Sequence, residues 1–406
     1  MFKSILTLSG ANLFFSISSF ISLAVVTKII GLTQFGLFAF SLSIAAILQV
    51  AFNTQSWQGI LKNDKFSKAI VSYCFLIDLF FATLASLVYL LVIKLLTIHF
   101  TDAEFMNWQY IIALLIFSIP NGTCLSIIRK FQLYNEQAKI DVVASIIRLV
   151  LILLCFFFKT NTFLTILVYV SADFIKSVGY FKILISNFNS LVRADGTFSQ
   201  INKIYSFSIW GVFNEIMHLP ASQLDRIICA TFISLEVLGV YDIFKRVCTS
   251  SIYITNPIMQ ICYPDFISKV KNTSINKSMS MLFKIVFSLL LVLSFLYFTI
   301  YLTRYSWAEL AFSISIDEWT EGYDILLSLF CISLLFTFSF IPIHPFYLAL
   351  GFAKRCFYIS LVGAFFYIIT ITIIAMNLPF YYLPLAIFIS DLTIIILKIL
   401  DIRRSL

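Results

Sequence analysis

A line of polar and ionisable side chains runs along the apolar segment 204–230. A spacing of three or four residues puts these side chains on one narrow face of a helix: Ser208, Gly211, Glu215, His218, Ser222 and Arg226. A carboxylate, an imidazole and a guanidinium on one face do not suit contact with lipid. They predict a hydrated surface that binds an anion or a coupling ion; the alternative is a buried polar network that holds helices together.

The next apolar segment, 237–262, carries a second stripe at helical spacing, which Pro257 ends: Asp242, Lys245, Arg246, Thr249, Tyr253 and Asn256. Three charged groups in the first half of one span need water or partners. Guanidinium and ammonium groups bind phosphate oxygens, and they do so more strongly in a low-dielectric setting than in water. This stripe therefore predicts a site for a phosphorylated ligand.

Charged residues also occur inside other apolar segments. Asp78, Arg148 and Asp391 stand alone in their runs, whereas Asp173 and Lys176 are three residues apart and can pair across one helical turn. Each is either a binding residue or part of a structural ion pair. We take Arg148 and Lys176 as further phosphate ligands, together with Arg226, Lys245 and Arg246. The candidates for binding a coupling proton or sodium ion are Asp78, Asp173, Glu215, His218 and Asp242.

The helices that must position these residues are membrane spans. The 406 residues are 61% hydrophobic and only 12% charged, with a mean hydropathy of +0.99, which excludes a water-soluble globule. About twelve apolar runs approach the ~20 residues that cross the hydrocarbon core as a helix. They lie near 5–27, 36–61, 70–97, 109–128, 142–158, 163–186, 204–230, 237–262, 282–303, 325–347, 356–377 and 380–402. We expect an all-α integral membrane protein.

An internal repeat organises these spans. Residues 22–38 return 203 positions later in 224–241, so that Gly36 matches Gly239 and Phe38 matches Tyr241. The polar connection 187–203 separates the halves. We expect two six-helix lobes, 1–195 and 196–406, and they should be parallel repeats because six crossings restore the starting side.

Through this repeat the first two spans correspond to 204–230 and 237–262. They carry their own polar stripes, in which amides stand out: Asn12, Gln49 and Asn53. Such stripes commonly bridge packed helices. Because four corresponding spans carry them, we expect them to line one cavity, where these amides and Asn256 suit sugar hydroxyl groups.

Charge and motifs limit the other functions. Basic residues gather on the side shared by both ends of the chain, so both termini are expected in the cytoplasm. The first span is expected to be an uncleaved signal anchor. The net charge of +8 then reflects topology and not a nucleic-acid partner. The sequence has no GxxxxGK[ST], HExxH or GxSxG motif, and its eight cysteines show no CxxC spacing. We expect no catalytic residue, cofactor or metal site.

The segments TKIIGLTQFGLFAFSLS and LDRIICATFISLEVLGVYDIFKR resemble the two halves of the polysaccharide-unit flippases, such as the O-antigen flippase, of the multidrug, oligosaccharidyl-lipid and polysaccharide exporter superfamily. The matching residues are Asp225 and Arg226, with Gly36 and Gly239 in the motif that follows the turn in each half. Ser234 departs from the family, which usually has Gly there.

The resemblance implies transport of an undecaprenyl-diphosphate-linked oligosaccharide, an O-antigen or capsule repeat unit. This substrate would move from the inner to the outer leaflet of a bacterial cytoplasmic membrane, by ion-coupled alternating access. Partners would be the lipid-linked sugar, the bilayer, a proton or sodium ion, and polysaccharide polymerase and chain-length proteins.

Three other functions remain open at this stage. One of them, a lipid II flippase, would share the cation-rich cavity but usually carries extra spans. A multidrug antiporter of the same superfamily would favour an acidic, aromatic cavity, and an oligosaccharide polymerase would show a large outer catalytic loop. We expect charge reversal at Arg226 or Arg246 to abolish transport.

Overall fold

The computed structural model describes residues 2–62, 67–96, 107–191, 198–219, 223–252, 255, 266, 275–312, 314 and 319–405. Over these ranges the chain forms helices, and nine of them are long and apolar enough to cross a membrane. One of the nine, Phe14–Phe52, covers two of the predicted spans, because α1 joins two helices at a kink. The predicted fold class, an all-α multi-pass membrane protein, is confirmed.

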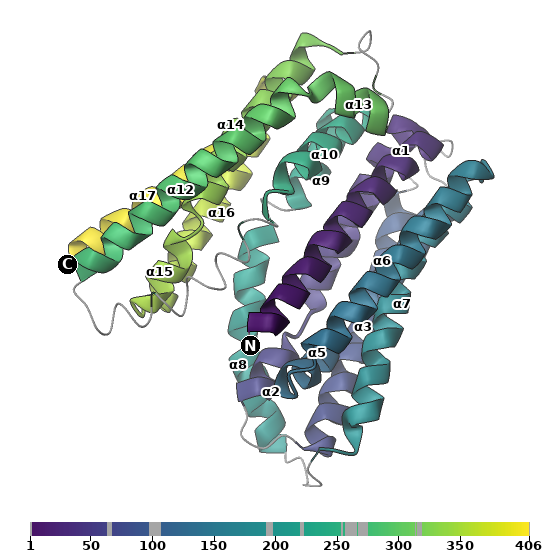
Figure 1. Cartoon of the computed structure of the whole chain (residues 1–406), viewed down its shortest axis with the longest axis vertical. Coiled ribbons are helices and arrows are strands. Elements are labelled where there is room, and N and C mark those ends of the chain that lie inside the picture. Colours follow the sequence, from purple (N-terminus) through teal and green to yellow (C-terminus); the bar gives the residue numbers. More distant parts are fainter. Residues whose placement is uncertain are drawn as a thin grey trace. The chain divides into compact units, whose positions relative to one another are not determined.

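The chain divides into two compact units, Met1–Leu219 and Pro220–Leu406. The first unit contains α1 (Phe2–Phe52), α2 (Ser56–Lys62), α3 (Lys68–Leu96), η1 (Asn107–Ile112), α4 (Ala113–Ile116), α5 (Asn121–Lys130), α6 (Tyr134–Phe157), α7 (Thr162–Phe188) and α8 (Phe198–Leu219). Within it α1 packs along α6, and α6 packs along α7 (Figure 1).

The second unit is built in the same way from long apolar helices. It contains α9 (Asp225–Phe232), α10 (Leu235–Thr249), α12 (Ile275–Leu302), α13 (Arg304–Phe312), α14 (Glu321–Phe340), α15 (Ile343–Ala349), α16 (Ala353–Asn377), η3 (Phe380–Tyr382) and α17 (Leu385–Ser405). Within it α14 packs against α12 and α17, and α16 packs against α17.

The division between the units falls after α8, whereas the sequence placed the lobe boundary at 195/196. α8 packs on α2 and α1 of the first unit. The contact with α2 is very close, since a Cβ atom on Gly59 would lie 2.5 Å from the backbone oxygen of Ile204. Small residues permit such crossings between membrane helices. The boundary of the lobes that move during transport stays a prediction.

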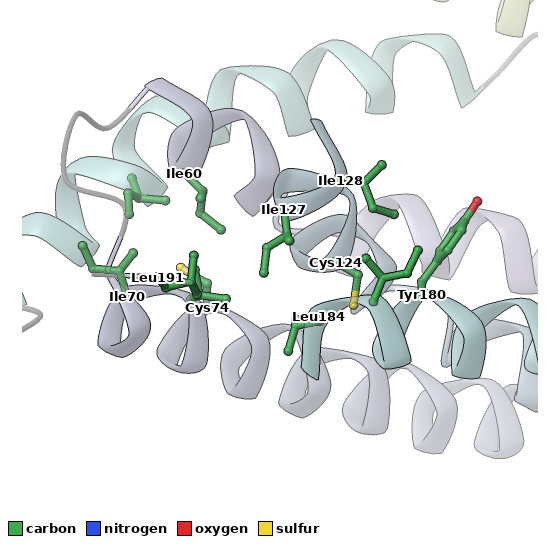
Figure 2. Packing of buried hydrophobic residues seen from close by; sticks show 12 residues of the cluster. Ile60, Ile70, Cys74, Cys124, Ile127, Ile128, Tyr180, Leu184 and Leu191 are labelled. Carbon is green, nitrogen blue, oxygen red and sulfur yellow. The ribbon is translucent and has the colours of Figure 1, made fainter. Parts of the chain in front are cut away.

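A buried cluster in the first unit ties α2, α3, α5 and α7 together. Ile60, Cys74, Ile127 and Leu184 come from these four helices, and their side chains converge in one apolar layer (Figure 2). Cys74 and Ile127 are fully buried. The cysteine acts here as a small apolar residue, as its spacing in the sequence indicates.

The repeat extends to the third helix of each half, where the offset is 208. Cys74, Asp78 and Tyr89 of α3 are buried, and so are Leu282, Val286 and Tyr297 at the matching positions of α12. Both tyrosines donate a hydrogen bond to a backbone oxygen, Tyr89 to Gln109 at 3.1 Å and Tyr297 to Cys248 at 3.0 Å. The matching positions of α3 and α12 are therefore buried alike, although their tyrosines bond to different elements.

Several predicted spans are not continuous helices. The segment 36–61 breaks at 53–55, 109–128 breaks at 117–120, and 325–347 breaks at 341–342. The predicted span 204–230 contains α8 and α9, and residues 220–222 between them lie outside the described residues. Prolines explain the breaks at Pro120 and Pro342, because proline lacks the N–H that continues a helix. Of 237–262, the structure describes residues 237–252 and 255 only.

Candidate functional site

A sharp turn between α9 and α10 brings two charged stretches of the second unit together. α9 ends at Phe232, and Ile233 and Ser234 have extended backbones, with ψ of 162° and 152°. The Ser234 hydroxyl then accepts a hydrogen bond from the Val237 N–H and caps α10. Residues near the start of α9 can therefore contact residues one to three turns along α10.

Asp242 lies between two arginines. Its Oδ1 is 2.5 Å from Nε of Arg226, and its Oδ2 is 2.6 Å from Nε of Arg246. Arg226 also donates from Nη1 to Oε1 of Gln223 at 2.7 Å. Both carboxylate oxygens thus accept charge-assisted hydrogen bonds, which are the stronger kind.

Asp225 forms the second half of the same cluster. Its Oδ2 accepts hydrogen bonds from Nζ of Lys245 at 2.6 Å and from the Tyr241 hydroxyl at 2.7 Å. Its Oδ1 is buried and has no hydrogen-bond partner among the described residues. The sequence had marked Asp225 only as a family-motif residue, and the structure shows that it holds Lys245.

These five charged residues, which we call the α9–α10 charge cluster, comprise three cations and two carboxylates: Asp225, Arg226, Asp242, Lys245 and Arg246. The carboxylate side chains are fully buried, and those of Arg226 and Lys245 are 9% and 6% exposed, whereas Arg246 is 28% exposed. Removing one member of a buried ion pair leaves an uncompensated charge. The cluster is a fixed unit that presents its excess positive charge at Arg246.

The first unit has its own cations, on α6 and α7. Nζ of Lys176 lies 3.0 Å from Oδ1 of Asp141, and the Tyr180 hydroxyl donates to the same oxygen at 2.6 Å. The predicted pairing of Lys176 with Asp173 across one turn is replaced by this contact between helices. Asp141 was missed, although its spacing to Ser145 and Arg148 puts all three on one face of α6.

Arg148 is buried beside this pair and is held mainly by aromatic rings. Its guanidinium carbon lies 4.9 Å from the ring centre of Phe15 and 5.4 Å from that of Tyr169. Its Nε and Nη2 make no hydrogen bond to any described residue. Cation–π contact stabilises the charge without using up its donors, so Arg148 keeps donors for an anionic group.

Asp78 does not face an open surface. It is buried and accepts hydrogen bonds from three hydroxyl groups, those of Thr54, Ser56 at 2.8 Å and Thr123 at 2.6 Å. Thr54 lies in the break between α1 and α2, Ser56 begins α2, and Thr123 lies on α5. The carboxylate thus fixes a broken span to its neighbours. Asp391 has a similar contact in the second unit, where the Thr337 hydroxyl donates to it.

The amides predicted to bind sugar have local roles at helix breaks. Gln49 donates to the Leu115 backbone oxygen at 2.6 Å and to the Ser118 hydroxyl at 3.0 Å, next to the break in 117–120. The Asn53 side-chain oxygen accepts from the Gln55 N–H at 3.0 Å, where Gln55 has a φ of +51°. The spacing of these amides puts them in one stripe only if the helix is continuous, and the chain breaks at 53–55. Asn256 and the side chain of Asn12 lie outside the described residues.

Two residues of the stripe on α8 contact other parts of the first unit. The Gly59 N–H donates to the Ser208 hydroxyl at 3.2 Å, and the half-buried Glu215 makes a side-chain hydrogen bond with Gln55. The side chain of His218 lies outside the described residues. Gly36 of α1 and Gly239 of α10 are both buried inside helices, at matching positions of the repeat. The described residues contain no cluster of three metal-binding side chains.

Comparison with known proteins places this geometry in context. A family described as "Polysaccharide biosynthesis protein" matches residues 1–270. An inward-facing multidrug resistance MATE family transporter of the MOP superfamily has 13% identity and a TM-score of 0.71, covering 98% of this chain and 94% of its own. No sequence among curated proteins matches the chain significantly.

Two further solved structures share the fold. A mutant form of a MATE transporter of Vibrio cholerae has 14% identity and a TM-score of 0.64, covering 99% of this chain and 96% of its own. A MOP superfamily transporter from Pyrococcus furiosus, described by a reversed polarity of its binding pocket, has 13% identity and a TM-score of 0.60, covering 99% and 95%. The fold is that of MOP superfamily transporters, as the sequence resemblance predicted.

Proposed function

This chain belongs to the polysaccharide biosynthesis protein family, and from that premise we propose that it is a flippase for a polyprenyl-diphosphate-linked oligosaccharide. The substrate would be an undecaprenyl-diphosphate-linked O-antigen or capsule repeat unit, moved from the inner to the outer leaflet of a bacterial cytoplasmic membrane. Both termini would lie in the cytoplasm. The six-helix lobes, 1–195 and 196–406, would rock during transport, so that the substrate gains access to one side of the membrane and then to the other.

The observation that supports this proposal is the composition of the α9–α10 charge cluster. Its three cations exceed its two carboxylates, and the excess charge lies at Arg246, the most exposed of the three cations. A guanidinium binds phosphate oxygens through paired N–H donors. We assign Arg246 to the diphosphate, and we assign Arg226 and Lys245 to holding the cluster together.

The first unit carries a cationic region of its own, on α6 and α7. Arg148 keeps unused donors between two aromatic rings, and Lys176 is a quarter exposed beside Asp141. Aromatic faces such as that of Phe15 also suit the apolar faces of sugar rings. We propose that Arg148 and Lys176 contact the phosphate or the first sugar.

Coupling to an ion gradient needs a titratable group that is not locked in an ion pair. Asp242 lies between two arginines and Asp78 among three hydroxyls, whereas Asp173 and Glu215 are partly exposed and belong to none of the ion pairs found among the described residues. We therefore propose Asp173 and Glu215 as the better candidates for binding a proton or sodium ion. The role of His218 in binding a coupling ion stays a prediction.

A multidrug antiporter is the second candidate function, because the structural neighbours include MATE transporters. Such a protein would favour an acidic cavity for cationic substrates, which the excess positive charge at Arg246 would repel. An oligosaccharide polymerase is less compatible still, since the structural neighbours named above are transporters. The chain would act with a polymerase and chain-length proteins that use the flipped repeat unit.

The test is transfer between leaflets. Purified protein is placed in vesicles with a fluorescent polyprenyl-diphosphate oligosaccharide, and a membrane-impermeant glycosidase reports how much substrate reaches the outer surface. We expect the wild type and Arg355→Gln, a control at an exposed ion pair with Asp401, to expose substrate faster than empty vesicles, and Arg246→Gln to lose most of this activity. Equal rates with empty vesicles, or glycans that grow without crossing, would contradict the proposal.

A further inference from the structure

A groove between α3 and α7 lies on the surface of the first unit. It has a volume of about 450 Å³ and is lined by Ser72, Phe75 and Leu76 of α3 and by Phe181, Ile185 and Phe188 of α7, among others. The buried Val71 and Leu184 form part of its lining. The rings of Phe75 and Phe181 stack at 5.2 Å between centres. The groove is therefore apolar along most of its length.

One end of this groove is cationic. Lys68 is the first residue of α3, and its Nζ donates to Oδ1 of Asn189 at 3.1 Å and lies 5.4 Å from the centre of the Phe188 ring. Asn189 is itself part of the lining. Lys68 belongs to none of the seven ion pairs found among the described residues. An ammonium group with three donors thus stands at the mouth of an apolar groove.

The length of the groove matches one leaflet. From Lys68 to Leu76 a helix rises about 12 Å, less than half of the ~30 Å hydrocarbon core. Lys68 and Asn189 lie at the ends of their spans, where a headgroup would be found. The distribution of basic residues assigns this end to the cytoplasmic side, where anionic lipids attract lysine and arginine near the surface.

The repeat supplies independent support. A second groove, of about 550 Å³, lies on α12 and is lined by Met279, Ser280, Phe283, Lys284 and Phe287. At the offset of 208, Ser280 and Phe283 match Ser72 and Phe75. Both halves thus carry a serine and a phenylalanine at matching positions of a groove, whereas the lysine of the second groove, Lys284, matches Leu76 and not Lys68. A carrier lipid used once per transport cycle would not require two such grooves, whereas lipids of the surrounding bilayer would fill both.

We propose that the groove between α3 and α7 binds an anionic phospholipid of the cytoplasmic leaflet, with its phosphate at Lys68 and one acyl chain along Phe75, Leu76 and Ile185. The groove has room for a single hydrocarbon chain. The ammonium complements the phosphate, and the Asn189 amide can donate a further hydrogen bond to it. The bound lipid covers the seam between α3 and α7 and so stabilises the first unit.

The test uses the purified full-length protein in native mass spectrometry. Phosphatidylglycerol and phosphatidylcholine with identical acyl chains are titrated separately, and retained lipid is counted on the protein. We expect phosphatidylglycerol to bind more tightly, and Lys68→Gln to weaken it about fivefold, the effect of one basic residue at a charged membrane surface. Ser72→Trp, which fills the groove, should weaken both lipids. Lys182→Gln is the matched control, because Lys182 is exposed on α7 but does not line the groove.

Three results would overturn the proposal. The first is equal binding of both lipids with no effect of Lys68→Gln. The second is an equal loss of phosphatidylglycerol binding in the Lys68 and Lys182 variants. The third is tighter binding of polyprenyl phosphate than of phosphatidylglycerol at equal concentration. The last would assign the groove to the carrier lipid instead. Size-exclusion profiles and thermal unfolding of each variant show whether it is folded, and for a misfolded Ser72→Trp, Ser72→Phe takes its place.

Discussion

Gly31 and Ser234 occupy the same position of the repeated motif, but they turn the chain in different ways. Gly31 has a φ of +78° and a ψ of 164°, whereas Ser234 has a φ of −66° and a ψ of 152° and caps α10 with its hydroxyl. Only glycine adopts the first conformation at little cost. The serine that departs from the family pattern is therefore suited to its own turn, where no positive φ is needed.

This difference predicts opposite responses to substitution. Gly31→Ala should destabilise the protein by about 1–3 kcal/mol, the cost of a strained backbone conformation, because a Cβ atom there meets nothing within 4 Å and the strain is purely conformational. Ser234→Gly should cost only a few tenths of a kcal/mol. Thermal unfolding in detergent compares the two. Equal shifts in Tm would show that the two turns are equivalent.

We predict that the carboxylates of the α9–α10 charge cluster are required for folding, because they neutralise buried cations. Asp225→Asn leaves Lys245 as a buried charge without its partner, which should cost about 3–5 kcal/mol. Asp225→Asn combined with Lys245→Met removes both charges and should recover much of this loss. Monodisperse yield and thermal unfolding measure the effect. A double variant as unstable as the single one would mean that the pair does more than neutralise charge.

Much of this arrangement can be read from the sequence. The stripe of Asp242, Lys245 and Arg246 follows helical spacing, and α10 does place these residues in one cluster. The repeat is visible because Gly36 and Gly239 align without a gap. Such inferences succeed because spacing within one helix fixes which residues share a face.

Contacts between helices could not be predicted in the same way. Asp141 binds Lys176 because α6 packs on α7, and no spacing within either helix reveals which side chains meet. Gln49 and Asn53 appeared to belong to a continuous stripe, but the chain breaks at 53–55 and these amides bond to the backbone around such breaks. Unsatisfied backbone groups inside a membrane require such partners.

Arg226 and Arg246, predicted from the sequence to be equivalent, should differ when substituted. Arg246→Gln removes a partly exposed cation and leaves Asp242 paired with Arg226, so we expect normal expression and transport reduced about tenfold or more, the effect of losing a hydrogen bond to a charged group. Arg226→Gln removes a buried partner and should reduce stability as well. The leaflet-transfer assay, normalised to folded protein, separates the two effects. Full activity of Arg246→Gln would exclude this residue from the substrate site.

Asp173 provides the sharpest test of coupling. It lies three residues from Lys176 on α7, yet Lys176 bonds to Asp141, so the Asp173 carboxylate belongs to none of the ion pairs found among the described residues, although Arg148 and Lys176 are near it. Asp173→Asn mimics the protonated form, and we expect transport to continue without responding to an imposed proton or sodium gradient. Glu136→Gln is the control, because Glu136 forms an exposed ion pair with Lys139 at the start of α6, so the gradient response should persist. The measurement compares transfer rates with and without each gradient in the same vesicles. If Asp173→Asn responds to the gradient as the wild type does, the coupling group lies elsewhere, and Glu215 becomes the next residue to substitute.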